Sequence, residues 1–245
     1  MSRERLKTIG VLGGMGPEAG AAFLERIVRE TAAARDQDHP PVILYSLPQV
    51  PDRTAAILHG GEDPVPALRR GLAVLAGAGA DFAVVSCVSA HYFLPRLVPR
   101  SPLPLISLID ETVTALGRMK LVPRAVGLLA TDGTVRSGIF ARAFEAAGIA
   151  VQTPSARDQA RLMKAIYGKK GVKAGITAGP PREAVLAVAR SLVRRGAEAV
   201  VAGCTEIPLV LEAADLAVPL VDPMTAGARA AVRRSGAALR RGADS

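Results

Sequence analysis

Aromatic side chains are scarce in this chain of 245 residues. They make up 3% of the sequence, and tryptophan is absent. Domains that recognise nucleic acids often stack bases on aromatic side chains, and the chain also lacks a zinc-finger or RNA-recognition signature. We therefore expect no nucleic-acid partner, although the formal net charge is +9.

Long hydrophobic runs are also missing. No stretch approaches the roughly 18 consecutive apolar residues that a membrane span needs, and residues 1–5 lead into a strand rather than a signal peptide. These absences predict a cytoplasmic protein with no membrane partner. The net positive charge favours a small anionic substrate. Part of this positive charge is expected on a solvated helix face and a frayed C-terminal end. The residues concerned are Arg229, Arg233, Arg234, Arg240 and Arg241.

Potential metal ligands are few, with two cysteines and three histidines in the whole chain. A structural disulfide is not expected in a cytoplasmic protein. The histidines His39, His59 and His91 show no ligand spacing with the cysteines. We therefore expect no metal site. A single cysteine would more often be a buried core residue than a catalyst.

The hydrophobic pattern is typical of an α/β protein. Short apolar runs alternate with amphipathic stretches, which favours βα units and a parallel sheet. Pro17 suits the first turn of a helix whose apolar stripe would contain Phe23, Leu24, Ile27 and Val28. Strands are predicted at residues 8–12, 41–47, 82–85, 105–108, 125–129, 199–202 and 218–221.

Two separated segments of the chain repeat in one register. Residues 7–12 align with 124–129, and residues 80–87 align with 197–204. The offset is 117 residues in both, the difference between Gly127 and Gly10 and between Cys204 and Cys87. The repeat predicts two pseudo-symmetric halves, each a doubly wound parallel sheet. We expect one half at 1–115 with a returning helix at 223–245, and the other at 116–222.

The repeat makes Cys87 and Cys204 equivalent. Ligands of doubly wound sheets bind outside the carboxyl ends of the strands, where both cysteines fall, so we expect the active site in the cleft between the halves. Inverting a carbon stereocentre without a cofactor needs a base on one face and an acid on the other. A thiolate and a thiol can serve, and a helix start after each cysteine would stabilise the thiolate.

Five motifs, in order along the chain, resemble those of the cofactor-independent aspartate/glutamate racemase family. They are IGVLGGMGP at 9–17, PQVPDRT at 48–54, CVSAHYF at 87–93, Ile166-Tyr167 followed by GVKAG at 171–175, and GCTEIPL at 203–209. The resemblance implies racemisation or epimerisation of an acidic amino acid such as aspartate or glutamate, without a cofactor. Similar proteins often dimerise, so a homodimer is also implied.

The resemblance also assigns roles to single residues. It implies that Cys87 and Cys204 are the catalytic pair. It places Met15 and Gly16 in a loop over the substrate, and Arg53 and Lys173 on its side-chain carboxylate. Substrate-binding positions that follow the cysteines are Val88, Ser89 and Thr205.

Two positions depart from the family pattern. Leu47 and Val88 stand where asparagine is usual, and the loss of two polar side chains favours a less polar or a modified acid. The substrate therefore stays open. His91 and Glu206 could either tune the thiols or satisfy helix termini.

Other functions are compatible with parts of the sequence. Gly14, Gly16 and Ala19 match a permissive dinucleotide-binding pattern. The strand at 42–47 does not end in an acidic residue, however, and Pro17 enters the loop, so an oxidoreductase is disfavoured. Nothing in the sequence requires pyridoxal phosphate. An isomerase of a non-amino-acid carboxylate, a decarboxylase with one thiol and an inactive ligand-binding relative stay open.

Overall fold

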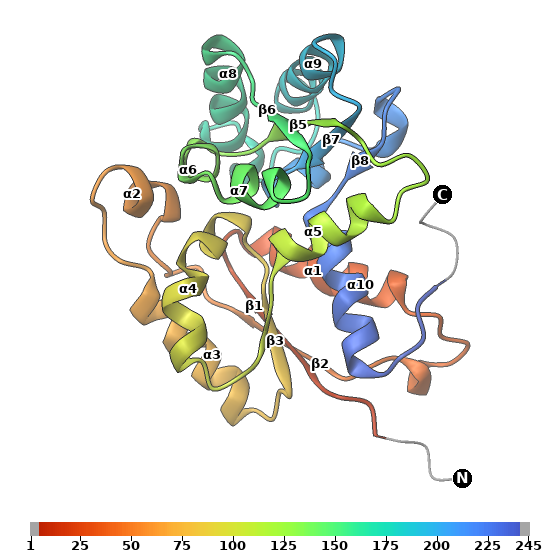
Figure 1. The fold of residues 1–245 in the computed structure, drawn as a ribbon. Coiled ribbons are helices and arrows are strands. Elements are labelled where there is room, and N and C mark those ends of the chain that lie inside the picture. The colour runs from red at the N-terminus through yellow and green to blue at the C-terminus, as the bar shows by residue number, and fades with distance from the viewer. Residues whose placement is uncertain (1–4, 241–245) are drawn as a thin grey trace.

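The computed structural model describes residues 5–240. Residues 1–4 and Arg241, for which expectations are given above, lie outside this range, as do the outer ends of the expected first half. Within it the chain forms two four-stranded parallel sheets with helices packed around them (Figure 1). The predicted α/β fold with two pseudo-symmetric halves is confirmed.

The first sheet has the strand order β2-β1-β3-β4. Each strand is a short apolar run, and β1 and β3 are buried along their whole length, as expected for a parallel sheet covered on both faces. The strands are β1 (Ile9–Gly13), β2 (Val42–Ser46), β3 (Phe82–Val85) and β4 (Leu105–Ile106). The helices of this half are α1 (Pro17–Glu30), α2 (Arg53–Leu58), α3 (Val65–Gly77), α4 (Leu94–Leu97) and α5 (Leu108–Gly117).

The second sheet repeats this topology with the order β6-β5-β7-β8. Its strands are β5 (Ala125–Leu129), β6 (Ala150–Gln152), β7 (Ala199–Ala202) and β8 (Leu220–Val221). Its helices are α6 (Asp132–Ser137), α7 (Ile139–Glu145), α8 (Ala156–Tyr167) and α9 (Pro180–Arg194). Because β1 pairs with β3 as β5 pairs with β7, the segments that follow β3 and β7 hold equivalent places.

The last helix, α10 (Pro223–Ser235), returns to the first half. It packs against α1 and α5, and Arg229 forms an ion pair of 2.6 Å with Glu30 of α1. This packing supports the division into residues 1–115 with 223–245 and residues 116–222, which we keep as a proposal. The Arg229 side chain is only 12% exposed, so the expectation that it lies on a solvated face is wrong.

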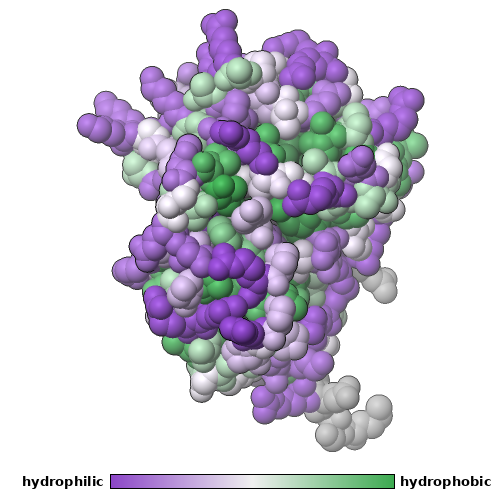
Figure 2. All heavy atoms as spheres, turned by 60° about the vertical axis from the view of Figure 1, so that its left-hand side comes forward, coloured by the Kyte–Doolittle hydropathy of each residue, from purple (hydrophilic) through white to green (hydrophobic). Residues whose placement is uncertain are grey.

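A shared hydrophobic core joins the halves. One cluster of buried side chains includes Val11 and Val84 of the first sheet and Val126 and Val201 of the second. Figure 1 shows the halves stacked on each other, with α2 beside α6 at one end. On the face shown in Figure 2, hydrophilic side chains surround several separate hydrophobic patches. Within residues 5–240, no helix is both long and apolar enough to cross a bilayer.

Several local predictions need correction. The strand expected at 105–108 ends at Ile106, because the Ser107 side chain accepts a hydrogen bond from Asp110 N–H and starts α5. The strand expected at 218–221 contains only Leu220 and Val221. Strand β6 was not expected at all. Val28 was expected in the apolar stripe of α1, but it is 47% exposed. The buried face of the helix contains Phe23 and Ile27 instead.

Candidate active site

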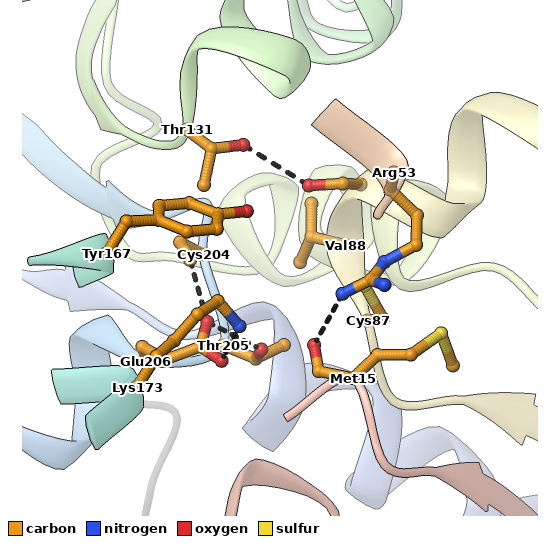
Figure 3. Close-up of a pocket in the computed structure, with 11 residues that line it drawn as sticks. Met15, Arg53, Cys87, Val88, Thr131, Tyr167, Lys173, Cys204, Thr205 and Glu206 are labelled. Carbon is orange, nitrogen blue, oxygen red and sulfur yellow. Dashed lines mark hydrogen bonds and ion pairs between the residues drawn. The ribbon is translucent and has the colours of Figure 1, made fainter. Parts of the chain in front are cut away.

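One pocket lies where segments from the two halves meet, and both cysteines line it. Cys204, Glu206, Lys173 and Tyr167 approach from one side, and Cys87, Arg53 and Met15 from the other (Figure 3). The lining residues are Met15, Arg53, Cys87, Val88, Ser89, Thr131, Tyr167, Lys173, Cys204, Thr205 and Glu206. The structure therefore brings together every site residue expected from the sequence except Gly16.

Cys87 occupies the first turn after β3. It is the N-cap of the 3-10 helix η2 (Val88–Phe93), which confirms the helix start expected after this cysteine. Its side chain belongs to a buried cluster with Met15 and Val50. Its side chain also lines the pocket, where it interacts with Arg53.

Arg53 begins α2 and is held by backbone carbonyls. Its Nη1 donates to the carbonyls of Val50 (3.1 Å) and Pro51 (2.9 Å), and its Nη2 donates to that of Met15 (3.4 Å). The residue is 8% exposed, and among the described residues its Nε–H has no hydrogen-bond partner. Burial is the largest single influence and opposes its charge, but the negative charges of Cys87, Asp52 and Tyr167 and a hydrogen bond to Cys87 together raise the pKa of Arg53. A fixed cation therefore faces the Cys87 thiol.

Cys204 has a different environment. It follows β7 and enters a turn before the three-residue 3-10 helix η5 (Ile207–Leu209), so the helix start expected after this cysteine begins at Ile207 and is short. Its Sγ donates a hydrogen bond of 2.9 Å to Glu206 Oε2. Burial, reinforced by the Glu206 charge, raises the pKa of Cys204 well above its usual value. The structure therefore favours the protonated thiol at this position.

Glu206 is the centre of a buried hydrogen-bond network. Its Oε1 accepts from Lys173 Nζ (2.5 Å) and from Gly16 N–H (3.2 Å), and its Oε2 also accepts from Thr205 Oγ1 (3.2 Å). Its side chain is 4% exposed. Burial of Lys173 is the largest single influence and opposes its charge, but Glu206, with smaller contributions from Cys204 and Cys87, raises the pKa of Lys173. Glu206 therefore contacts both a thiol and the N-cap residue of α1, Gly16.

Hydroxyl groups line another part of the pocket. Ser89 Oγ lies 2.8 Å from Thr134 Oγ1 and 3.3 Å from Thr131 Oγ1, and the two threonine hydroxyls are 3.2 Å apart. Ser89 belongs to the first half and both threonines to the second, so the cluster links the halves. Val88 contributes an apolar surface beside it.

Tyr167 connects the halves across the pocket. Its hydroxyl is 3.4 Å from Thr54 Oγ1 and 3.5 Å from Asp52 Oδ2, both at the start of α2, and its ring lies under Lys173 Nζ at 5.5 Å. Burial raises the pKa of Tyr167 to about 12, so it is a hydroxyl donor at neutral pH. The remaining cavity of about 10 Å³ is close to the minimum for one water molecule. An amino acid can enter only if side chains move.

Three residues singled out in the sequence lie outside the pocket wall. Gly16 does not line the pocket, but its N–H donates a hydrogen bond to Glu206, which does. Leu47 packs against a hydrophobic cluster that contains Leu12 and Met15 and is not among the lining residues. His91 Nδ1 donates to the Cys87 carbonyl, and its Nε2 accepts from the N–H of Leu108 at the start of α5, both at 2.9 Å.

Sequence reasoning missed Thr131 and Tyr167 as pocket residues. The 117-residue repeat could have indicated Thr131, because it aligns this residue with Gly14 in the first glycine turn. Tyr167 belongs to one of the five motifs, but no pattern in the sequence indicates which way its ring points.

Comparison with known proteins gives a consistent result. A family model described as Asp/Glu/Hydantoin racemase matches residues 12–231. The chain is 31% identical to the aspartate racemase of Picrophilus torridus, with 96% of each chain covered and a TM-score of 0.86. An aspartate racemase homologue from Pyrococcus horikoshii shares the fold at 21% identity, with 94% of this chain and 100% of that chain covered and a TM-score of 0.73. A broad specificity amino-acid racemase of Bacillus subtilis is 23% identical over 91% of this chain and 96% of its own length. The chain therefore belongs to the Asp/Glu/hydantoin racemase family and is an isomerase of the racemase type.

Proposed function

We propose that this protein racemises an acidic amino acid, such as aspartate or glutamate, by moving protons between the substrate and its two cysteines without a cofactor. One observation carries the proposal. Cys87 and Cys204 follow equivalent strands of two pseudo-symmetric sheets and line one pocket from different sides. A planar carbanion held between them would be open to proton transfer on both faces.

The two thiols have different surroundings. The Arg53 guanidinium faces Cys87, while Glu206 accepts a hydrogen bond from the thiol of Cys204. In one direction the Cys87 thiolate removes the α-proton, so that the C–H bond breaks and an S–H bond forms. The Cys204 thiol then donates its proton to the opposite face of the carbon. For the other enantiomer the two cysteines exchange roles.

The pocket also offers groups that would bind an acidic amino acid. The free Nε–H of Arg53 suits a substrate carboxylate, and the charge of Lys173 suits the second one. The hydroxyls of Ser89, Thr131 and Thr205 can donate to carboxylate oxygens or accept from the α-ammonium. Positive groups near the α-carboxylate would also stabilise the negative charge that develops as the α-proton leaves.

A second candidate is racemisation of an amino acid with a less polar side chain. The apolar wall at Val88 favours it, and the broad specificity of the Bacillus subtilis relative is consistent with it. The two candidates share the same chemistry and differ only in the side chain that the pocket accepts.

Proton NMR in deuterated buffer tests the proposal directly. The α-hydrogen signals of L- and D-aspartate, L- and D-glutamate and a panel of less polar amino acids are followed with the wild type, Cys87→Ser and Cys204→Ser. We expect exchange with inversion in the wild type and loss of racemisation in each variant. Wild-type rates in either variant would refute the two-cysteine mechanism, and inversion of the less polar substrates alone would favour the second candidate.

A further inference from the structure

A carboxylate of the protein itself occupies one end of the pocket. Glu206 Oε1 accepts hydrogen bonds from Lys173 Nζ at 2.5 Å and from Gly16 N–H at 3.2 Å. An ammonium group and a backbone N–H that converge on one oxygen form a typical binding site for a carboxylate. The Lys173 charge, which suits a second substrate carboxylate, is therefore already paired.

The packing leaves no room for another carboxylate beside this pair. A Cβ atom added to Gly16 would lie 3.2 Å from Glu206 Oε1 and 3.9 Å from Lys173 Nζ. The Tyr167 ring covers Lys173 from the other direction. With only about 10 Å³ of cavity remaining, a ligand carboxylate can reach Lys173 only by moving Glu206 Oε1 away.

The charges suggest which ligands cause that movement. The described lining residues contain two cations, Arg53 and Lys173, and one carboxylate, Glu206. A ligand with one carboxylate can bind at Arg53 and leave the Lys173–Glu206 pair in place. A ligand with two carboxylates offers Lys173 an alternative partner.

We propose that Glu206 is an internal substitute for the second carboxylate of the substrate, and that a dicarboxylic substrate displaces it from Lys173. This proposal rests on the proposed function and identifies Glu206 as a residue that sets specificity. Affinity for the substrate then reflects an exchange of one carboxylate for another at Lys173. The exchange costs a ligand more than binding to a free lysine would.

Displacement of Glu206 also affects Cys204. Glu206 Oε2 accepts a hydrogen bond from Cys204 Sγ at 2.9 Å, and a carboxylate that has lost its ammonium partner is a better proton acceptor. A proton can then pass from Cys204 to Glu206, with the S–H bond broken and an O–H bond formed. Substrate binding would thus produce the Cys204 thiolate that removes the α-proton of one enantiomer, while a Cys87 thiol donates its proton to the opposite face of the carbon. Cys204 is then a thiol again. The proton held by Glu206 passes to solvent as Glu206 returns to Lys173, and Cys87 takes up a proton from solvent.

Glu206→Gln tests this proposal because it removes the charge while keeping the size of the side chain. Calorimetric titration measures the binding of succinate, a dicarboxylate without an α-ammonium, and of propionate, its monocarboxylate counterpart. We expect Glu206→Gln to bind succinate about tenfold more tightly than the wild type, since Lys173 no longer has a charged partner to lose. Propionate affinity should stay the same, and kcat for aspartate should fall at least about tenfold because the amide accepts no proton.

Tighter binding together with slower turnover separates this role from a purely structural one, which would weaken both. Glu145→Gln is the matched control, because Glu145 is exposed on α7 away from the lining residues. If circular dichroism shows that Glu206→Gln does not fold, Glu206→Asp replaces it. Its carboxylate is one methylene shorter and cannot contact Lys173 and Cys204 together, so it should also tighten succinate binding.

Unchanged or weaker succinate binding in a folded Glu206 variant would overturn the proposal. The result can be distinguished from failure of the proposed function. A wild type that racemises aspartate and binds succinate, with no tightening in the variant, refutes only the role of Glu206. A wild type that neither racemises an amino acid nor binds succinate refutes both.

Discussion

His91 should make the stability of the fold sensitive to mild acid. The side chain is buried, and the N–H of Leu108 donates to its Nε2 while its Nδ1 donates to the Cys87 carbonyl. These partners require the neutral imidazole with its proton on Nδ1. Burial lowers the pKa of His91 from its usual value of 6.5 to about 4, so the unfolded chain binds a proton at this residue more readily than the folded one does.

Proton linkage gives the sign and the size of the effect. Because the folded-state pKa is the lower one, His91 contributes full stability above the unfolded-state pKa and loses it as the pH falls toward about 4. For these two pKa values the free energy of unfolding should fall by about 2 kcal/mol between pH ~7 and pH ~5. The loss continues below that range.

Urea unfolding at a series of pH values measures this loss in the wild type and in His91→Gln. Glutamine carries no titrating group, so carboxylates elsewhere contribute equally to both proteins and cancel in the difference. At neutral pH the variant should also be about 1 to 3 kcal/mol less stable, because a hydrogen bond at Cys87 or Leu108 is lost. His59→Gln is the control, since His59 is exposed. Equal pH slopes for the wild type and His91→Gln would refute the reasoning.

Three further predictions concern the pocket and its loops. Tyr167→Phe removes the hydroxyl contact with Thr54, so iodoacetamide should alkylate the pocket cysteines severalfold faster, and an unchanged rate would show that this contact does not limit access. Arg53→Lys cannot reproduce the guanidinium hydrogen bonds and should weaken succinate binding about tenfold by calorimetry; unchanged affinity would mean that Arg53 does not contact the ligand. Gly14→Ala places a Cβ atom 2.4 Å from the Leu47 backbone at a φ of +95°, and should cost well over 2 kcal/mol in urea unfolding. Gly60→Ala, with a φ of +63° and nothing within 4 Å, should cost only about 1 to 2 kcal/mol, and equal losses at the two glycines would refute the steric argument.

Strands with long apolar runs were predicted most accurately. Strands β3, β5 and β7 were predicted with the bounds observed, and β3 and β7 are unbroken apolar runs in which all four residues are buried. Strand β6 was missed because Ala150 is exposed and the strand has only three residues. An edge strand of this kind is stabilised by pairing with β5, and that pairing leaves no periodic pattern in the sequence.

The roles of His91 and Glu206 could not be predicted from the sequence either. His91 and Glu206 each stand close to a cysteine in the sequence, and the motifs did not distinguish their roles. His91 contacts the Cys87 carbonyl and the start of α5, whereas Glu206 contacts the Cys204 thiol. The difference depends on which way each side chain turns after its strand, and neighbouring elements decide that.

The sequence by itself determined the two-half α/β plan and the equivalent placing of Cys87 and Cys204. Apolar runs, glycine turns and an internal repeat are properties of chain order, and they set which residues follow which strand. Only the tertiary structure decided what surrounds each thiol. Gly16 meets Glu206 across 190 residues of sequence, and Tyr167 meets Thr54 across 113. Such contacts depend on how the two halves pack. The pairing of Arg53 with Cys87 and of Glu206 with Cys204 depends instead on the folding of the chain within each half.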